Sequence, residues 1–469
     1  MNSLQNSIKH VAVIIFLAIL AYSNIFGNKL VVDDHIFVGT YHPSIPEAFT
    51  GVVPLGHEGV YRPIRGLFYT LYGSNPVIYH LNSLLVHVLS TVLVYLIISH
   101  ITRLRRMGLI TGILFALHPV HTETITYIAS GMDSIGIVFF LASFYLYLKN
   151  RFWISILFAL FAFFTTEMTL TLPILIIFHD WIFNKLSKQK IVIYGSYILS
   201  AIAYIFIRFQ VLQITTRGQY LADSLYLTML TMTKVVMHYI WVLIWPVNLL
   251  NNHSISPGIE SFVYRGYRTT AIMAQSLFDP TILGAIGVIV LIWAMCVKLK
   301  RTYPVISFAI GLFFIGLLPV MNLIPQGSIM NEKSLYISSI GFVMLMGCGL
   351  QKLGKIGLIG VIILSSLYGF RTYVRNRDWY DDTTVWAKDV QLEPTENAYA
   401  RFALGNAYND QKQYSQAVDQ YQKSVEINPG FAVGYASLSR TYRDMGEIEL
   451  SNQNYQKAEH AEPGFWSRP

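Results

Sequence analysis

The segment VAVIIFLAILAYSNIF, from Val11 to Phe26, is followed closely by Val31-Val32-Asp33-Asp34-His35-Ile36-Phe37. About 20 predominantly apolar residues cross the hydrocarbon core of a bilayer as a helix. No small-residue cleavage site followed by soluble sequence comes after this segment, so we interpret it as a retained first membrane span rather than a signal peptide. The stretch therefore predicts a membrane chain whose first outer loop carries two adjacent carboxylates and an imidazole.

The composition extends this interpretation to most of the chain. Of its 469 residues, 54% are hydrophobic and 13% are charged, whereas a soluble domain carries about 25% charged residues. The net charge of +8 does not indicate a nucleic-acid partner, because many basic residues lie in short loops between apolar segments. Cys296 and Cys348 both lie in apolar segments, and they predict neither a disulfide framework nor a metal site.

Length and hydropathy predict an all-α polytopic bundle of about eleven spans. We expect them at 9–27, 78–99, 109–128, 135–148, 152–164, 170–183, 191–209, 282–297, 305–323, 335–350 and 356–373. The inner loops of this arrangement hold thirteen Lys and Arg residues and no acidic residue. The positive-inside rule then predicts a cytoplasmic N-terminus and a periplasmic or lumenal C-terminal part, in a bacterial inner membrane or an endoplasmic reticulum.

The segment 225–246 is also long and apolar enough to span. A span there would move Lys298, Lys300 and Arg301 to the outer side, so we predict a re-entrant or interfacial element. In the outer loop 28–76, apolar residues recur at a spacing of three to four from Ile64 to Tyr72, with Arg62 and Arg65 among them. This pattern predicts an amphipathic helix at the interface whose arginines hold a lipid phosphate near Asp33, the alternative being ordinary headgroup contact.

The last part of the chain has a different composition. Residues 1–374 contain twelve Asp and Glu, and the remaining 95 residues contain fourteen, which places a domain boundary near Arg375. Residues 398–431 and 432–465 align with a period of 34 and the pattern of tetratricopeptide repeats. We predict a membrane domain over 1–374, a linker and partial repeat over 375–397, and two repeats over 398–469. Because such arrays need about three repeats, the array should lean on the membrane part through 375–397 or on a partner.

Polar groups gather on the predicted outer side. Beside Asp33 and Asp34 they are His35, His80, His118, His121, Glu123, Glu167, Glu332 and Lys333. Each one alone is consistent with a hydrogen bond between helices, but together they predict a polar cavity that opens outward. His118, His121 and Glu123 are zinc-type ligands, but Pro119 interrupts the helix that would present them, so we predict no metal site.

The chemistry that suits this set is group transfer at the membrane surface. A carboxylate takes the proton of an incoming hydroxyl, and cations stabilise a departing phosphate. Asp33 is the candidate base, Asp34 would position the acceptor or a divalent cation, and Arg62, Arg65 and Lys333 are candidates for the donor phosphate. No nucleophile elbow is present, and a transporter would place its carboxylates within the spans, with a solute pathway reaching Asp180.

Several short motifs point to a known family: Val32-Asp33-Asp34-His35, Tyr61-Arg62-Pro63, Asn75-Pro76, Tyr79-His80, Asn82 to His87, Ala116-Leu117-His118-Pro119-Val120-His121-Thr122-Glu123, Leu172-Pro173, Leu317-Leu318-Pro319, Asn322-Leu323, Leu335-Tyr336 and Ser339-Ile340-Gly341. The layout resembles the C-type-fold membrane glycosyltransferases, specifically the transmembrane-and-tetratricopeptide (TMTC-like) relatives of protein O-mannosyltransferases. The resemblance covers nearly the whole chain.

The resemblance implies a sugar donor on a polyprenyl (dolichyl-type) phosphate, a base in the Asp33-Asp34 pair, and inverting transfer to a Ser or Thr hydroxyl of an extracytoplasmic protein. Three positions depart from the family pattern. Met132 stands where relatives have Arg, Thr166 where they have Lys, and Lys333 where they have Arg. The first two changes remove a cation, and the third matters because Lys and Arg are not equivalent at a phosphate. These departures favour an alternative function, a membrane scaffold or assembly factor that docks partners through its repeats.

Overall fold

The computed structural model of the protein describes residues 2–51, 60–214, 218–256, 259–260, 276–326 and 328–467. These residues are predominantly helical, and their only strands are the short antiparallel pair β1 (Ser254–Ser256) and β2 (Ile259–Glu260). The all-α class predicted from the sequence is therefore confirmed. The outer loop 28–76 is described except for residues 52–59.

The membrane part runs from α1 to α16. Its helices are α1 (Asn2–Ala21), α2 (Asp34–Gly39), α3 (Ile45–Thr50), α4 (Pro63–Tyr72), α5 (Pro76–Thr102), α6 (Arg105–Leu117), α7 (Thr122–Thr126), α8 (Ile128–Leu148), α9 (Phe152–Phe163), α10 (Leu172–Ile182), α11 (Ile191–Phe206), α12 (Leu225–Ile244), α13 (Pro280–Leu299), α14 (Pro304–Leu317), α15 (Leu335–Lys352) and α16 (Gly354–Arg375). Several begin at proline, which lacks the N–H that a first turn leaves unpaired.

Local sequence explains where these helices begin and how closely they pack. Asn75 caps α5 by accepting the Val77 N–H, and Asp279 caps α13 by accepting the Thr281 N–H. Between α14 and α15 the backbones approach so closely that a Cβ on Gly341 would lie 2.3 Å from the Ala309 carbonyl oxygen. Glycine is therefore the residue that this crossing requires.

Eight helices of the described chain are long and apolar enough to cross a membrane. Seven of them coincide with predicted spans, and the eighth is α12. The other four predicted spans fall on the shorter helices α6, α9, α10 and α14. A helix of 11 to 14 residues is only about 16–21 Å long against a hydrocarbon core of about 30 Å. The predicted count of eleven is therefore not confirmed.

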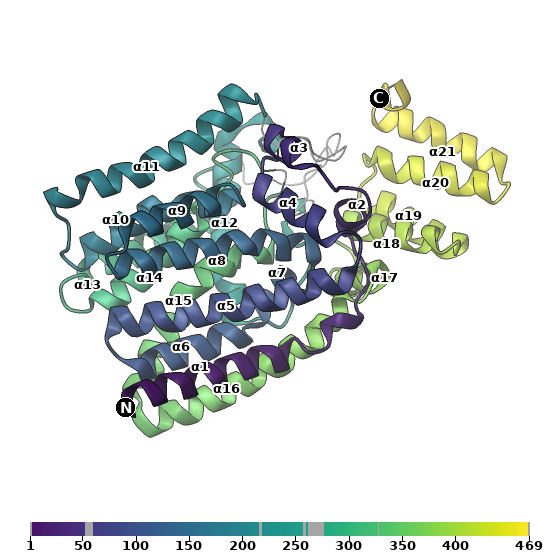
Figure 1. Ribbon diagram of the computed structural model, residues 1–469. Helices are drawn as coiled ribbons and strands as arrows, with labels where there is room; N and C mark the ends of the chain where they lie inside the picture. Colours follow the sequence, from purple (N-terminus) through teal and green to yellow (C-terminus); the bar gives the residue numbers. More distant parts are fainter. Residues whose placement is uncertain are drawn as a thin grey trace.

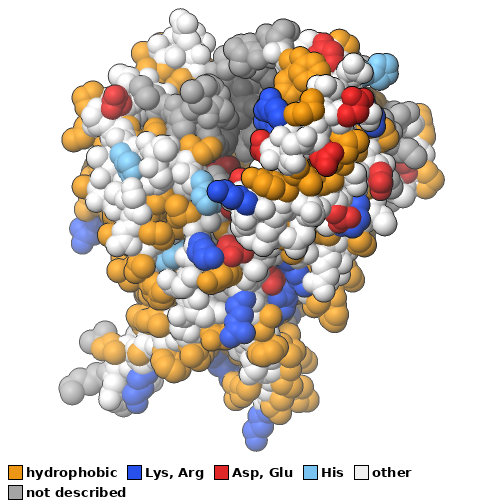
Figure 2. All heavy atoms as spheres, turned by 90° about the vertical axis from the view of Figure 1, so that its right-hand side faces the viewer, with side chains coloured by type: hydrophobic (Ala, Val, Ile, Leu, Met, Phe, Trp, Pro, Cys, Tyr) orange, Lys and Arg blue, Asp and Glu red, His pale blue; other side chains and the backbone are white. Residues whose placement is uncertain are grey.

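The long helices lie roughly side by side, with the N-terminus at one end of the bundle and α2, α3, α4 and the C-terminal helices toward the other (Figure 1). We call the latter the outer end. Figure 2 looks onto this end and shows acidic and basic side chains spread across it. The loop that carries Asp33 and the repeats thus occupy the same end of the molecule, as the sequence predicts.

Both ends of α12 contact segments of the outer end. Just before it, the Tyr220 hydroxyl donates to the Leu323 carbonyl, and just after it the Leu250 N–H donates to Glu332. Leu323 and Glu332 belong to the single connection between α14 and α15. These contacts favour an element that returns to the same side, and the re-entrant placement stays a prediction, since α12 is also long enough to cross.

The helix predicted from the Ile64–Tyr72 pattern is present as α4 (Pro63–Tyr72). Arg65 and Tyr69 are buried, whereas Leu71 is exposed and Ile64, Leu67 and Phe68 are only half-buried. Arg65 turns inward because a carboxylate on α8 lies there to receive it, as described below. The apolar spacing predicted the helix correctly, but it did not show that Arg65 turns toward the protein interior.

The C-terminal helices are α17 (Asp382–Leu392), α18 (Ala398–Asp410), α19 (Tyr414–Ile427), α20 (Ala432–Asp444) and α21 (Ile448–Ala461). Each packs against the next one along the chain. A Cβ on Gly405 of α18 would lie 2.5 Å from the ring of Tyr421 of α19, so the glycine allows these two helices to pack closely. Gly405 and Tyr421 are two of the positions on which the sequence pattern rests.

Candidate active site at the outer end

The loop between α1 and α2 presents the acidic pair. Asp33 directly precedes α2, and Val32 before it has φ of +53°. A β-branched residue rarely adopts this left-handed conformation. After this backbone turn at Val32, the Asp34 carboxylate is buried, whereas the Asp33 carboxylate is only half-buried.

Asp34 is fully buried. Its Oδ1 accepts the Ala129 N–H at 2.8 Å and its Oδ2 accepts the Val31 N–H at 3.3 Å. Burial raises the pKa of this carboxyl to about 8, since removal from water disfavours the charged form. Asp34 therefore anchors the loop to the start of α8. Its buried position gives it a structural role that the sequence did not indicate, and its contact with an acceptor or a cation stays a prediction.

Asp33 is half-buried, and no hydrogen bond or ion pair among the described residues engages its carboxylate. Its backbone N–H donates to the Tyr127 hydroxyl at 3.3 Å. The Tyr127 ring stacks on Trp379, with centroids 5.4 Å apart. Asp33 is thus the member of the pair whose carboxylate stays available, on a backbone held by its neighbours.

Lys333 lies near the same tyrosine. Its Nζ is 5.4 Å from the centre of the Tyr127 ring and 3.8 Å from Glu123 Oε1, and its N–H donates to Glu123 Oε2. The lysine side chain keeps 36% of its surface exposed. Glu123, which is buried, orients the lysine backbone, and the ammonium group remains reachable from outside. Tyr127 therefore contacts both the backbone of Asp33 and the side chain of Lys333.

The arginines of α4 are already paired. Arg62 donates to both oxygens of Asp133 at 2.8 and 2.7 Å and to Glu167 Oε2 at 2.7 Å. Arg65 donates to Asp133 Oδ1 at 2.7 Å, and its guanidinium lies over the Phe37 ring. Arg208 donates to Glu167 Oε1 at 2.7 Å. We call these five residues the arginine cluster.

The arginine cluster carries three positive and two negative formal charges. Its carboxylates hold the guanidinium groups of Arg62 and Arg65 inside the protein, so these two do not stand free for a donor phosphate. Arg208, which the sequence did not single out, lies in the π-helical turn Ile207–Val211 after α11 and reaches Glu167. It supplies a cation to Glu167, whose neighbour in the chain, Thr166, is uncharged.

The predicted pocket histidines are mostly interior. His80 contacts the Asn28 carbonyl, His118 contacts the Leu243 carbonyl, and His121 contacts the Ser339 hydroxyl. All three are fully buried. These rings join helices and do not line a cavity that opens outward.

Two further predicted residues lie apart from this interior set. Glu332 is fully buried, where its Oε1 accepts the Leu250 N–H at 2.6 Å and contacts His253 Nε2 at 3.1 Å. His35 is exposed, and its Nε2 lies 2.7 Å from Asp382 Oδ2 at the start of α17. The structure thus brings Asp33, His35 and Lys333 to the outer surface, and it places Glu332 inside the core.

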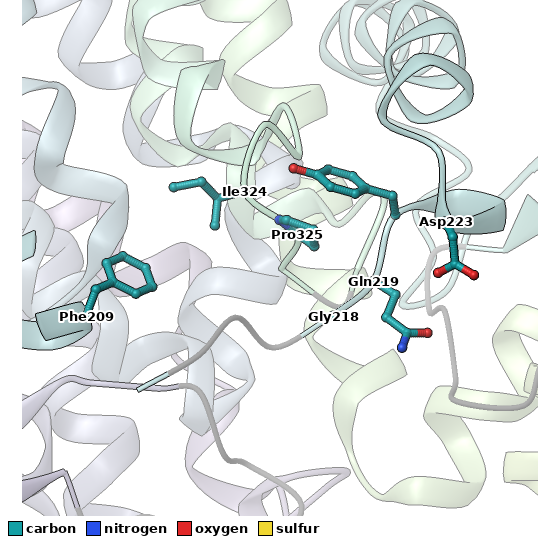
Figure 3. Close-up of a pocket in the computed structure, with 7 residues that line it drawn as sticks. Phe209, Gly218, Gln219, Asp223, Ile324 and Pro325 are labelled. Carbon is teal, nitrogen blue, oxygen red and sulfur yellow. The ribbon is translucent and has the colours of Figure 1, made fainter. Parts of the chain in front are cut away.

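A cavity of about 520 Å³ has Phe209, the residue after Arg208, in its lining (Figure 3). Its described lining consists of Phe209, Gly218, Gln219, Tyr220, Asp223, Ile324 and Pro325. None of these is a predicted site residue. Within the residues that the structure describes, no group of three or more His, Cys, Asp and Glu is arranged as a metal site.

Asp180, the residue on which a transport pathway would depend, is enclosed. Its Oδ2 accepts from Lys190 and Tyr194 at 2.6 and 2.7 Å, and its Oδ1 contacts His179 at 2.8 Å. The side chain is fully buried. A carboxylate with these partners links the end of α10 to the start of α11 and offers no free ligand to a solute.

Comparison with known proteins gives a consistent set of relatives. Protein O-mannosyl-transferase TMTC3 of Mus musculus is 24% identical over 97% of this chain and 55% of its own length. Protein O-mannosyl-transferase F38B6.6 of Caenorhabditis elegans is 24% identical over 91% of this chain and 64% of its own length. The homologues of the present chain are therefore TMTC protein O-mannosyl-transferases.

These TMTC relatives are longer than the present chain, which spans between about half and two thirds of their length. The family model of the tetratricopeptide repeat matches residues 398–431, the window that the 34-residue period defines. No solved structure matches. The resemblance seen in the sequence is therefore confirmed at the level of the homologues and of the repeat.

Proposed function

We propose that this chain is a membrane glycosyltransferase that transfers a sugar from a polyprenyl (dolichyl-type) phosphate to a hydroxyl of an extracytoplasmic acceptor, a protein Ser or Thr. The observation that carries the proposal is the difference in burial and hydrogen bonding between the two carboxylates of the acidic pair. Asp34 is buried and holds the loop, and Asp33 keeps its carboxylate available within the surroundings of Tyr127 and Lys333. The names of the TMTC relatives support the reaction class.

In the proposed step, the Asp33 carboxylate takes the proton of the acceptor hydroxyl. The hydroxyl oxygen forms a bond to the anomeric carbon as the bond from that carbon to the phosphate oxygen breaks. The polyprenyl phosphate leaves with the electron pair, and the configuration at the anomeric carbon inverts. Atoms and charge balance without a cofactor, and Lys333 stabilises the negative charge that develops on the phosphate.

The reaction would take place at the outer end of the bundle. We place the N-terminus on the cytoplasmic side and the repeats on the periplasmic or lumenal side, following the basic inner loops. The lipid tail of the donor lies among the membrane helices, and the acceptor approaches from the side of the repeats. The apolar faces of α11 and α13, which are exposed in the structure, suit contact with lipid.

The alternative, a scaffold that docks partners through its repeats, is favoured by Met132. This side chain is buried, and its Sδ lies 3.8 Å from Asn82 Nδ2. The family pattern has a cation at this position. A scaffold needs no available carboxylate. Replacing Asp33 by Asn should therefore abolish function if the chain is a glycosyltransferase, and it should have no effect if the chain is a scaffold.

The test compares cells that carry the wild-type chain, a deletion, or Asp33→Asn. Asp444→Asn, an exposed position on α20, is the matched control. We expect glycopeptides that are present with the wild type and with Asp444→Asn to be missing from both the deletion and Asp33→Asn, at equal protein levels. If Asp33→Asn restores every glycopeptide that the deletion lacks, Asp33 is not the base. If the deletion changes no glycopeptide, the chain is not a glycosyltransferase under those conditions and the scaffold is preferred.

A further inference from the structure

The loop that carries Asp33 is held by a segment from the far end of the chain. The Asn28 side chain donates to the Asn376 carbonyl at 3.0 Å, and the Lys29 N–H donates to the Tyr380 carbonyl at 2.8 Å. The exposed Lys29 ammonium group lies 3.3 Å from Asp381. Residues 376–382, which join α16 to the first helix of the repeats, therefore run alongside residues 28–35.

Within residues 376–382, Asp382 makes the contacts that lie nearest to Asp33 along the chain. Its Oδ1 accepts the Val32 N–H at 2.8 Å, and its Oδ2 lies 2.7 Å from His35 Nε2. One carboxylate thus contacts the residue before the acidic pair and the residue after it. The hydrogen bond to Asp382 raises the pKa of His35, so that a charged imidazole favours this contact.

The contact at Val32 bears on the direction of the Asp33 side chain. Val32 has φ of +53°, a conformation that persists in a β-branched residue only where the surroundings impose it. The hydrogen bond from the Val32 N–H to Asp382 fixes the peptide group at this turn. Relaxation of Val32 toward a common conformation would rotate the chain immediately before Asp33 and move its carboxylate.

We propose that Asp382 is a positioning residue for Asp33, and that the segment leading into the repeats is thereby part of the active site. The inference rests on the proposed function, in which Asp33 is the base. Asp382 itself need not touch either substrate. It acts by holding Val32 and His35, so that the Asp33 carboxylate meets the acceptor hydroxyl in one fixed geometry.

Three variants of the full chain separate this role from general stability. Asp382→Ala removes both contacts. Asp382→Asn keeps an amide oxygen that can accept the Val32 N–H, and so it is the conservative variant. Lys29→Ala is the matched control, since it removes the exposed ion pair between the same two segments and leaves Val32 untouched.

The first measurement is hydrogen–deuterium exchange of the peptide that covers residues 30–37 in the purified protein. We expect faster exchange in Asp382→Ala than in the wild type, with Asp382→Asn and Lys29→Ala close to the wild type. This readout does not need transfer activity. Equal exchange in Asp382→Ala and the wild type would overturn the inference, whatever the protein catalyses.

The second measurement is transfer from dolichyl phosphate mannose to a threonine-containing peptide. We expect kcat of Asp382→Ala to fall by roughly 10- to 100-fold, the scale of a misplacement of about 1 Å, with KM for the donor unchanged. Asp382→Asn should recover most of kcat. A wild-type kcat in Asp382→Ala beside an inactive Asp33→Asn overturns the inference alone. Full activity of Asp33→Asn overturns the proposed base and the inference together.

Discussion

Neutralising Asp133 tests whether the arginine cluster is a structural clamp. Asp133 accepts three hydrogen bonds from Arg62 and Arg65 at 2.7–2.8 Å, and only 21% of its side chain is exposed. In Asp133→Asn, three guanidinium groups would face Glu167 as the one remaining carboxylate of the cluster. The variant keeps the shape of the side chain and removes its charge, so its effect reports on the ion pairs.

The expected size follows from the burial of the cluster. Removal of one partner from a buried ion pair costs about 3–5 kcal/mol, because the other charge is left uncompensated. Asparagine still accepts one hydrogen bond, which places the expected loss near the lower figure, about 3 kcal/mol. For a chain of this size that loss lowers Tm by roughly 3 °C.

The assay is thermal unfolding of the detergent-purified protein, followed by tryptophan fluorescence. Asp419→Asn is the matched control, because it removes an exposed ion pair with Lys423 and should cost less than about 1 kcal/mol. Inorganic phosphate should raise the Tm of Asp133→Asn more than that of the wild type, since a guanidinium group freed from Asp133 can bind a phosphate.

An Asp133→Asn protein that melts with the wild type would refute the clamp. The arginines of α4 would then hold their positions without the carboxylate, and they would again be candidates for the donor phosphate. Equal responses of the two proteins to phosphate would instead refute the reasoning that Asp133 occupies the guanidinium groups.

Three further predictions concern other parts of the chain. Lys333→Met should raise KM for dolichyl phosphate mannose by about 10- to 100-fold, the scale of a lost charge-assisted hydrogen bond, with Lys355→Met as the control. Asp34 has a folded pKa of about 8 against a usual value of 3.8. The folded protein therefore keeps a proton that the unfolded chain releases, so stability should fall as pH rises from about 4 to about 8, and Asp34→Asn should flatten that profile in thermal unfolding. Gly405→Ala should destabilise the repeats by about 1–3 kcal/mol, because its Cβ would lie 2.5 Å from the Tyr421 ring, and limited proteolysis should cut α18–α19 faster.

Each of these has a distinct contrary result. An unchanged donor KM in Lys333→Met would remove the lysine from the phosphate site. A stability that rises with pH over the same interval in the wild type, and not in Asp34→Asn, would show that Asp34 is charged in the folded protein. An unchanged rate of proteolysis in Gly405→Ala would show that α18 and α19 accommodate the added methyl group without loss of stability.

Periodic features were predictable from the sequence because they depend on neighbours in the chain. The 34-residue period defined the repeat window that the family model matches, and the apolar spacing predicted α4. Seven of the predicted spans coincide with long apolar helices for the same reason. Hydropathy alone could not show that α9 and α10 are too short to cross as straight helices, since two apolar helices joined by a turn give the same profile as two full spans. The boundary near Arg375 stays a prediction.

The site depended on pairings between distant residues, which a single sequence does not reveal. Arg65 was expected at the interface and lies inside, because Asp133, 68 positions away, receives it. Arg208 and Asp382 had no local motif to mark them. The two members of the acidic pair could not be told apart either, because the burial of Asp34 depends on the Ala129 N–H at the start of α8.

The contacts between residues 28–35 and 376–382 also set an order in time. The Val32 N–H and the Asp382 carboxylate are 350 positions apart, a stretch that takes roughly 20–70 s to synthesise at about 5–20 residues per second. During that interval the acidic loop has left the ribosome and its partner has not been made. We expect a nascent chain to remain incompetent for transfer until the last membrane helix has been inserted, so that activity itself reports the completion of biogenesis.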